Sequence, residues 1–475
     1  MDKFFKLKAS NTNIKTEILA GCTTFFTMVY IIFVNPRILS AADMPSDAVF
    51  IATIFAAVIG TLVMGFVANV PYAQAPGMGL NAFFAFTVCG TMGFVWQEAL
   101  ALVFICGLIN IVLTVTKIRK VIIRSIPPSL QNAIGGGIGI FIAYIGLKSA
   151  GFLTFIADPG TFFVADSGTA IIDSSIVPEL STFNNSGMIL ALIGLIVTII
   201  LLVKKVHGSI FIGIVFTTIL AIITGNVSLA GVKFFDFKSI SALSQTSFSL
   251  FGNPGLGSMF DSPGKIFLSI TAIFAFSLSD TFDTIGTFIG TGKVSGIFDD
   301  KDEQALMDGN GFKSKMDKAL FADATATSIG ALLGTSNTTT YVESAAGINV
   351  GGRTGLTSIT VAILFLLCLP FSGLLGIVPA QATAPALIIV GAMMMSSFAD
   401  IKWKEFTEAV PAFITVAVMA FAYNISYGIA AGFIFFCVVK FSQKKFNEVH
   451  PILLGATVLF ILNFIILALR AAGIF

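Results

Sequence analysis

The sequence predicts an all-α polytopic membrane protein of about 14 transmembrane segments, arranged as two sets of seven in an inverted repeat. Hydrophobic residues make up 56% of the 475 residues and charged residues only 11%, whereas soluble domains carry about 25% charged residues. Apolar runs of about 20 residues, the length that crosses a bilayer, follow one another along the chain. Lys and Arg gather in alternate connections, which is typical of cytoplasmic loops.

The segments are bounded by Gly, Pro and charged residues. The first seven are expected near 17–37, 48–69, 74–92, 97–116, 128–148, 188–203 and 209–225. The second seven are expected near 266–290, 317–334, 338–350, 355–376, 380–397, 405–424 and 425–441. A last apolar run at 452–471 is either a fifteenth crossing or evidence that the pair at 405–441 does not fully span. No small-residue cleavage site follows the first segment, so we interpret it as a retained helix and not a signal peptide.

The basic residues place the N-terminus in the cytoplasm of a multi-pass protein of the cell membrane. The basic residues predicted on the same side of the membrane as the N-terminus are Lys117, Arg119, Lys120, Arg124, Lys204, Lys205, those of the 293–318 loop, Arg353, Lys402, Lys404 and those of the 440–445 stretch. The 149–187 loop holds Asp158, Asp166, Asp173 and Glu179, and apart from Lys148 just before it no basic residue, as expected outside.

Two segments are too polar and too rich in Gly, Pro and Thr for a continuous lipid-facing helix. They read PYAQAPGMGLNAFFAF at 71–86 and GTSNTTTYVESAAGINV at 334–350. Irregular backbone at membrane depth is tolerated only inside the protein or beside a watery cavity. Each is the third segment of its seven, and because seven is odd, consecutive sevens lie in opposite orientations. Paired broken segments in an inverted repeat predict a substrate site near the midplane.

Apart from acidic residues within the first four positions of a segment, four carboxylates fall inside predicted segments, where ionisable groups are costly and indicate function. They are Asp280, Asp283, Asp323 and Glu343. No Lys or Arg lies deep in a segment, which disfavours an anionic substrate and favours N–H donors, a coupling cation or proton uptake. Asp280 and Asp283 are three residues apart and can share a helix face, although either could cap a break or bond a neighbouring helix. For Asp323, near the start of its segment, a structural role is favoured.

Other polar and aromatic side chains near the broken segments are weaker candidates. The amide of Asn81 can both donate to and accept from a heterocycle edge, or it satisfies backbone in a Gly-rich turn. Phe84 and its neighbouring phenylalanines could supply a face on which a base stacks. The chain has 49 phenylalanines, so any single one is a weak candidate. Gln131 and Asn132 could equally cap a helix. We expect the GGGIG run at 135–139 to mediate close helix packing.

Several other functions are excluded or disfavoured. The five cysteines form no CxxC pair and the two histidines sit at segment ends, so no disulfide framework, metal site or cofactor is expected. A net charge of +2 leaves no basic surface for nucleic acid. GTGKV at 290–294 lacks the pattern of a phosphate-binding loop. Asp280 and Asp283 share one helix, which argues against an intramembrane aspartyl protease, and we expect no enzyme.

Over nearly its whole length the chain resembles the nucleobase–cation symporter-2 family, in its adenine, guanine and hypoxanthine permease branch. The motifs that carry this resemblance are GCTTFFTMVYIIFVNP (21–36), PGMGLNAFFAF (76–86), SIPPSLQNAIGGGIGIFIAYIGL (125–147), SDTFDTIGT (279–287) and FADATATSIGALLGTSNTTTYVESAAGI (321–348). The uracil and xanthine branches carry Glu in segment 8 where this chain has Asp, which favours the purine branch.

The resemblance implies a core domain (1–126 and 251–378), a gate domain (127–250 and 379–475), and short extended pieces in segments 3 and 10 that frame the substrate. The substrate-binding residues that follow from it are Asn81, Phe84, Asp283, Glu343 and Ser344, and the proton-coupling candidates are Asp280, Asp283 and Glu343.

The implied activity is import of purine nucleobases by symport with protons, with Na⁺ not excluded and with alternating access between the two domains. A homodimer is a further family-level expectation. The alternatives are a xanthine or uracil permease of the same fold and, from a different class, a channel.

Overall fold

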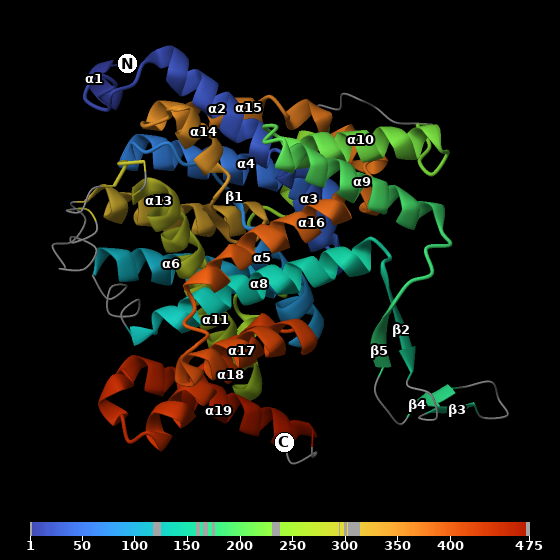
Figure 1. Ribbon diagram of the computed structural model, residues 1–475, viewed down its shortest axis with the longest axis vertical. Coiled ribbons are helices and arrows are strands. Elements are labelled where there is room, and N and C mark those ends of the chain that lie inside the picture. The colour runs from blue at the N-terminus through green and yellow to red at the C-terminus, as the bar shows by residue number, and fades with distance from the viewer. Residues whose placement is uncertain are drawn as a thin grey trace.

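The computed structural model describes residues 2–116, 125–157, 162–164, 170–172, 176–229, 238–293, 295–298, 302 and 314–471. These residues form a predominantly helical protein (Figure 1). The helices of the first seven segments are α2 (Ile14–Met28) with α3 (Ile31–Leu39), α4 (Ser46–Val63), α5 (Met78–Ala82), α6 (Trp96–Val115), α8 (Pro128–Ser149), α9 (Ser186–Val203) and α10 (Ser209–Ile223). Those of the second seven are α11 (Pro263–Thr287), α13 (Lys315–Leu333), α14 (Ser344–Val350), α15 (Gly355–Leu366), α16 (Ala380–Met394), α17 (Phe406–Phe421) and α18 (Ile425–Ser442). The predicted order of segments is confirmed.

Not every segment is a long apolar helix. Within the described part of the chain, 8 helices are long and apolar enough to cross a membrane, or 9 if a pair bent by 62° (Gly355–Leu366 with Leu369–Ile377) counts as one span. The other segments are short, polar or interrupted. Such elements are stable at membrane depth only when protein surrounds them.

The two broken segments meet as a pair of strands. β1 (Gln74–Pro76) and β6 (Thr338–Thr340) run antiparallel, with Ala75 opposite Thr339. Both strands are buried, so their pairing satisfies backbone groups that water cannot reach. The short extended pieces predicted for segments 3 and 10 are therefore confirmed, and the pairing adds that the two touch each other.

Besides the third segments, two more pairs of equivalent segments of the two sevens pack together. The second segments meet as α4 against α13, and the fifth segments meet as α8 against α16. At the α8–α16 crossing, a Cβ atom on Gly139 would collide with the carbonyl of Gly391, and one on Gly391 would collide with the carbonyl of Gly139. This reciprocal contact confirms that the glycine run at 135–139 mediates close helix packing.

Helices α8, α16, α17 and α18 pack on one another, and α2, α4, α6, α13 and α15 form a second set of packed helices. The division into core and gate domains at residues 126, 250 and 378 stays a prediction.

Three features lie outside the fourteen segments. The short helix α1 (Asp2–Phe5) precedes them, and α19 (Pro451–Ala471) follows and packs against α18 and α11. The connection after α8 contains an unpredicted ladder between β2 (Leu153–Ala157) and β5 (Ile176–Leu180), and β3 (Phe162–Val164) pairs with β4 (Ala170–Ile172). These strands project away from the helices (Figure 1). The predicted loop charges at 117–124, at Asp158, Asp166 and Asp173, and over most of 293–318 lie outside the described residues.

Candidate functional site

A cavity of about 630 Å³ lies beside the paired strands. One wall comes from the 1–126 and 251–378 stretches, with Tyr30, α5, α11 and the residues that follow β6. The opposite wall comes from α8, the end of α16 and the following helical turn η9 (Met395–Asp400). No Lys or Arg occurs among the described residues that line it. The cavity therefore lies between residues of the two predicted domains, and the charged side chains among its described lining residues are the carboxylates of Asp283, Glu343 and Asp400.

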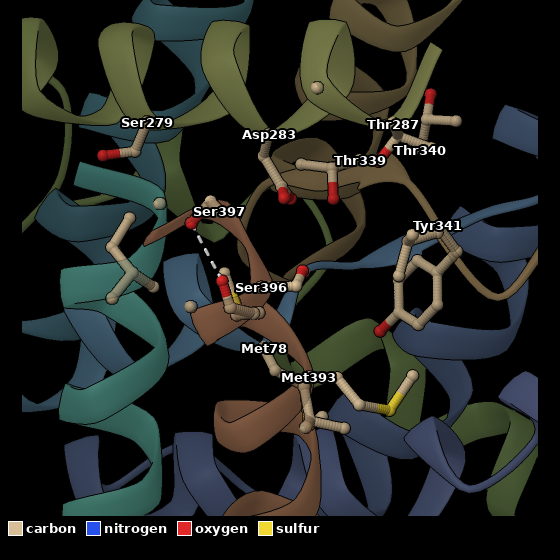
Figure 2. A pocket seen from close by; sticks show the side chains of 18 of the residues that line it. Met78, Ser279, Asp283, Thr287, Thr339, Thr340, Tyr341, Met393, Ser396 and Ser397 are labelled. Carbon is tan, nitrogen blue, oxygen red and sulfur yellow. Dashed lines mark hydrogen bonds between the residues drawn. The ribbon is translucent and has the colours of Figure 1, made fainter. Parts of the chain in front are cut away.

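Asp283 extends from α11 into this cavity, beside Thr339 of β6 (Figure 2). Its carboxylate makes no hydrogen bond or ion pair with any residue in the described part of the chain. A carboxylate in a confined, largely apolar site needs a compensating donor or a proton. Asp283 is thus available to a ligand or to a proton.

Glu343 lies between β6 and α14 and also lines the cavity. The hydroxyl of Tyr30 donates a hydrogen bond of 2.5 Å to its Oε1 atom, and the Thr27 hydroxyl donates to its backbone carbonyl at 3.4 Å. Tyr30 lies in the interruption between α2 and α3, so a break in segment 1 brings the phenol to segment 10. Tyr30 is not among the site residues predicted from the sequence, although it is one of only 6 tyrosines and falls inside the motif at 21–36.

Asp280 and Asp283 share α11 but meet different neighbours. The amide of Asn110 on α6 donates a 2.9 Å hydrogen bond to Asp280, and the same Asn110 accepts one from Ser277. Asp280 is fully buried and is not part of the cavity wall. The structure therefore separates the two acids: Asp283 meets the cavity, and Asp280 joins α11 to α6.

Asp323 bonds strand β6 instead of lining the cavity. Its Oδ1 atom accepts hydrogen bonds from the Thr340 N–H at 2.9 Å, the Thr340 hydroxyl at 2.8 Å and the Thr284 hydroxyl at 2.8 Å. These contacts support the structural role favoured from its position in the sequence.

The remaining predicted residues are buried next to the cavity without lining it. Asn81 donates to the carbonyl of Pro76 at 3.4 Å and accepts a hydrogen bond from Ser336, which joins the two broken segments. Ser344 accepts from the Ala73 N–H at 3.1 Å, and Phe84 is fully buried. A direct role in binding stays a prediction for these three.

Most residues of the cavity wall opposite Asp283 were not predicted from the sequence. This wall includes Met393, Ser396 and Ser397, which Figure 2 shows across the cavity from Asp283 and Thr339. Gln131 and Asn132, which the sequence left open as site residues or helix caps, both line the cavity. The Gln131 side chain donates to the Ile126 carbonyl at 2.7 Å, and no side chain of the described residues caps the start of α8. Met393, Ser396 and Ser397 carry no local signal of a site, because they lie in a stretch of apolar and small residues.

Comparison with known proteins gives the family and the fold. The Permease family profile matches residues 15–431. The guanine/hypoxanthine permease PbuO of Bacillus subtilis is 40% identical over 473 residues, covering 98% of this chain and 100% of that protein. The adenine permease AdeQ of Escherichia coli is 38% identical over 467 residues, covering 98% and 96%. The transmembrane domain of a cyanobacterium bicarbonate transporter, BicA, has the same fold, with a TM-score of 0.58 at 16% identity over 88% of this chain and 97% of that one.

Proposed function

Because the chain belongs to the Permease family, in its nucleobase–cation symporter-2 group, we propose that it imports purine nucleobases across the cell membrane by symport with protons. The substrates proposed are adenine, guanine and hypoxanthine, the bases for which the similar permeases PbuO and AdeQ are named. The N-terminus is placed in the cytoplasm, as the basic loops predict.

The observation that carries this proposal is the charge of the cavity. Asp283 and Glu343 face a space whose described lining contains no cation. A neutral heterocycle with N–H donors matches such acceptors, whereas a small anion would offer them no donor and would add like charge beside two carboxylates. A volume of about 630 Å³ also leaves room for a purine together with water.

The two carboxylates have different roles in this mechanism. Glu343 accepts N–H donors of the base. Asp283, which has no partner among the described residues, takes up a proton from outside and releases it inside. Its neutralisation lowers the cost of moving the site through a low-dielectric region, since an uncompensated buried charge costs several kcal/mol.

Alternating access follows from the position of the cavity between two walls. The cavity extends to Asp400, two residues before Lys402 in a predicted cytoplasmic loop. We therefore interpret this conformation as inward-facing. A shift of the wall that holds Asp283 and Glu343 against the wall of α8 and α16 would expose the same site to the outside.

The test is uptake of radiolabelled hypoxanthine into liposomes of purified protein, with and without an inward proton gradient, competed by adenine, guanine, xanthine and uracil. We expect saturable, gradient-dependent accumulation that adenine or guanine blocks and uracil does not. Glu343→Gln should abolish it, whereas Glu405→Gln, at an exposed residue that pairs with Lys402, should not. Normal transport and affinity in Glu343→Gln would refute the assigned site. Flux that neither saturates nor concentrates the base would indicate a channel.

A further inference from the structure

Segment 1 contributes a phenol to the proposed binding carboxylate. Tyr30 is fully buried within the protein yet forms part of the cavity wall. Its hydroxyl lies 2.5 Å from Oε1 of Glu343, which is short for a hydrogen bond and typical of a phenol donating to a carboxylate. Thr27, one helical turn earlier, contacts the Glu343 backbone. Segment 1 therefore holds both the side chain and the main chain of Glu343.

This bond limits how the carboxylate can turn. A phenol has one hydrogen to donate, and a carboxylate has about four lone-pair sites on its two oxygens. Tyr30 occupies one site on Oε1, and among the described residues the carboxylate is otherwise contacted by the backbone N–H of Glu343 itself. Sites on both oxygens remain for a ligand, and the rotation that sets their direction is restrained.

Restraint matters most for a ligand that uses both oxygens at once. Guanine presents two adjacent donors, N1–H and the 2-amino group, which can bond both oxygens of one carboxylate in parallel. Hypoxanthine lacks the 2-amino group and has only N1–H on that edge. A single bond can follow a rotating carboxylate, whereas a paired bond requires a fixed plane, and a fixed partner avoids the entropy cost of ordering it on binding.

We propose that Tyr30 is a positioning residue that fixes the carboxylate plane of Glu343 and thereby favours purines with a 2-amino group beside N1–H. This inference rests on the proposed function and deepens it, because it assigns preference within the purines to a residue in segment 1. Tyr30 acts through Glu343, and its own contact with the base is not required.

The experiment is equilibrium binding of guanine and hypoxanthine to the purified full-length protein, with wild type, Tyr30→Phe and Tyr144→Phe compared. Tyr30→Phe removes only the hydroxyl, so ring packing is kept. We expect it to weaken guanine binding about 10-fold, which corresponds to about 1.4 kcal/mol, and to weaken hypoxanthine binding less than about 3-fold. Tyr144, on α8 and outside the cavity wall, should leave both affinities unchanged when its hydroxyl is removed.

A second variant keeps the test decisive if Tyr30→Phe does not fold. Glu343→Asp retains a carboxylate but withdraws it by one methylene from the phenol, so the guanine-to-hypoxanthine affinity ratio should fall in the same way. An equal loss for both bases, or an unchanged ratio in either folded variant, overturns the inference. Wild-type protein that binds no purine overturns the proposed function instead, so the two failures are distinguishable.

Discussion

The carboxylate of Asp323 on α13 accepts hydrogen bonds from both the backbone N–H and the hydroxyl of Thr340, at 2.9 and 2.8 Å. The same oxygen accepts from Thr284 on α11, the residue after Asp283. One buried carboxylate thus connects α11, α13 and strand β6 behind the cavity. The positions of Asp283 and of the strand that leads to Glu343 both depend on it.

Asp323→Asn should therefore damage both stability and transport. The amide oxygen of Asn can still accept the three bonds, but it carries no charge, so each bond is weaker, and the NH2 group adds a donor to a buried site, at a cost of about 1–3 kcal/mol. We expect a lower melting temperature in detergent and at least a tenfold loss of purine uptake. Thr325→Ala is the control, since that hydroxyl bonds only the Phe321 carbonyl of its own helix. Wild-type melting and uptake in Asp323→Asn would show that the connection is dispensable.

The different neighbours of Asp280 and Asp283 lead to different predictions. Asn at position 283 cannot exchange a proton, so Asp283→Asn should lose gradient-driven accumulation and retain exchange of labelled for unlabelled base. Asp280→Asn should keep gradient-driven accumulation and lower the melting temperature, because it disturbs the bond to Asn110 between α6 and α11. Uptake and exchange assays on both variants distinguish a coupling role from a structural one. The roles are reversed if Asp280→Asn alone uncouples transport from the gradient.

Glu17 on α2 should stabilise the start of α15. Its buried carboxylate accepts from the N–H groups of Arg353 at 2.9 Å and Thr357 at 3.1 Å, and from the Thr357 hydroxyl at 2.6 Å. A carboxylate that bonds the free N–H groups of a helix start stabilises the helix, and its loss costs about 0.5–2 kcal/mol. Glu17→Ala should speed hydrogen exchange at Arg353 and Thr357, measured by mass spectrometry of that peptide. The neighbouring Lys15→Ala should not, and equal protection in Glu17→Ala would contradict the assignment.

Glu448, beyond the last of the fourteen segments, should contribute pH-dependent stability. The pKa of its carboxyl is lowered from the usual value, chiefly by a hydrogen bond from Lys440 at 2.8 Å and to a smaller extent by one from Lys445. A lowered folded-state pKa means that the stabilisation is present above the unfolded pKa of about 4.3 and is lost as the pH falls through the folded value. The melting-temperature difference between wild type and Glu448→Gln should be largest near neutral pH and shrink below about pH 4.5. A difference that stays constant with pH would exclude this linkage.

Much of the fold could be predicted because its signals are local. Three signals can be read within one segment or its adjoining loop: the length of the apolar run, the charge of the connections, and breaks rich in Gly, Pro and Thr. These signals predicted the order of segments and the extended pieces at β1 and β6. The ladder between β2 and β5 was not predicted, because this loop of mixed composition has no clear alternation of apolar and polar residues that would indicate strands. The count of long apolar helices was smaller than the count of segments because protein contacts replace lipid around the broken ones.

For the site, the sequence by itself determined which groups are too costly to bury without a purpose, and it gave four candidates: Asp280, Asp283, Asp323 and Glu343. Only the tertiary structure decided which neighbour each carboxylate meets: the cavity for Asp283, Asn110 for Asp280, the backbone of β6 for Asp323 and the phenol of Tyr30 for Glu343. Tyr30 and Glu343 are separated by 313 positions in the chain. A hydrogen bond between them depends on how segments 1 and 10 pack, and no local pattern of residues encodes that distance.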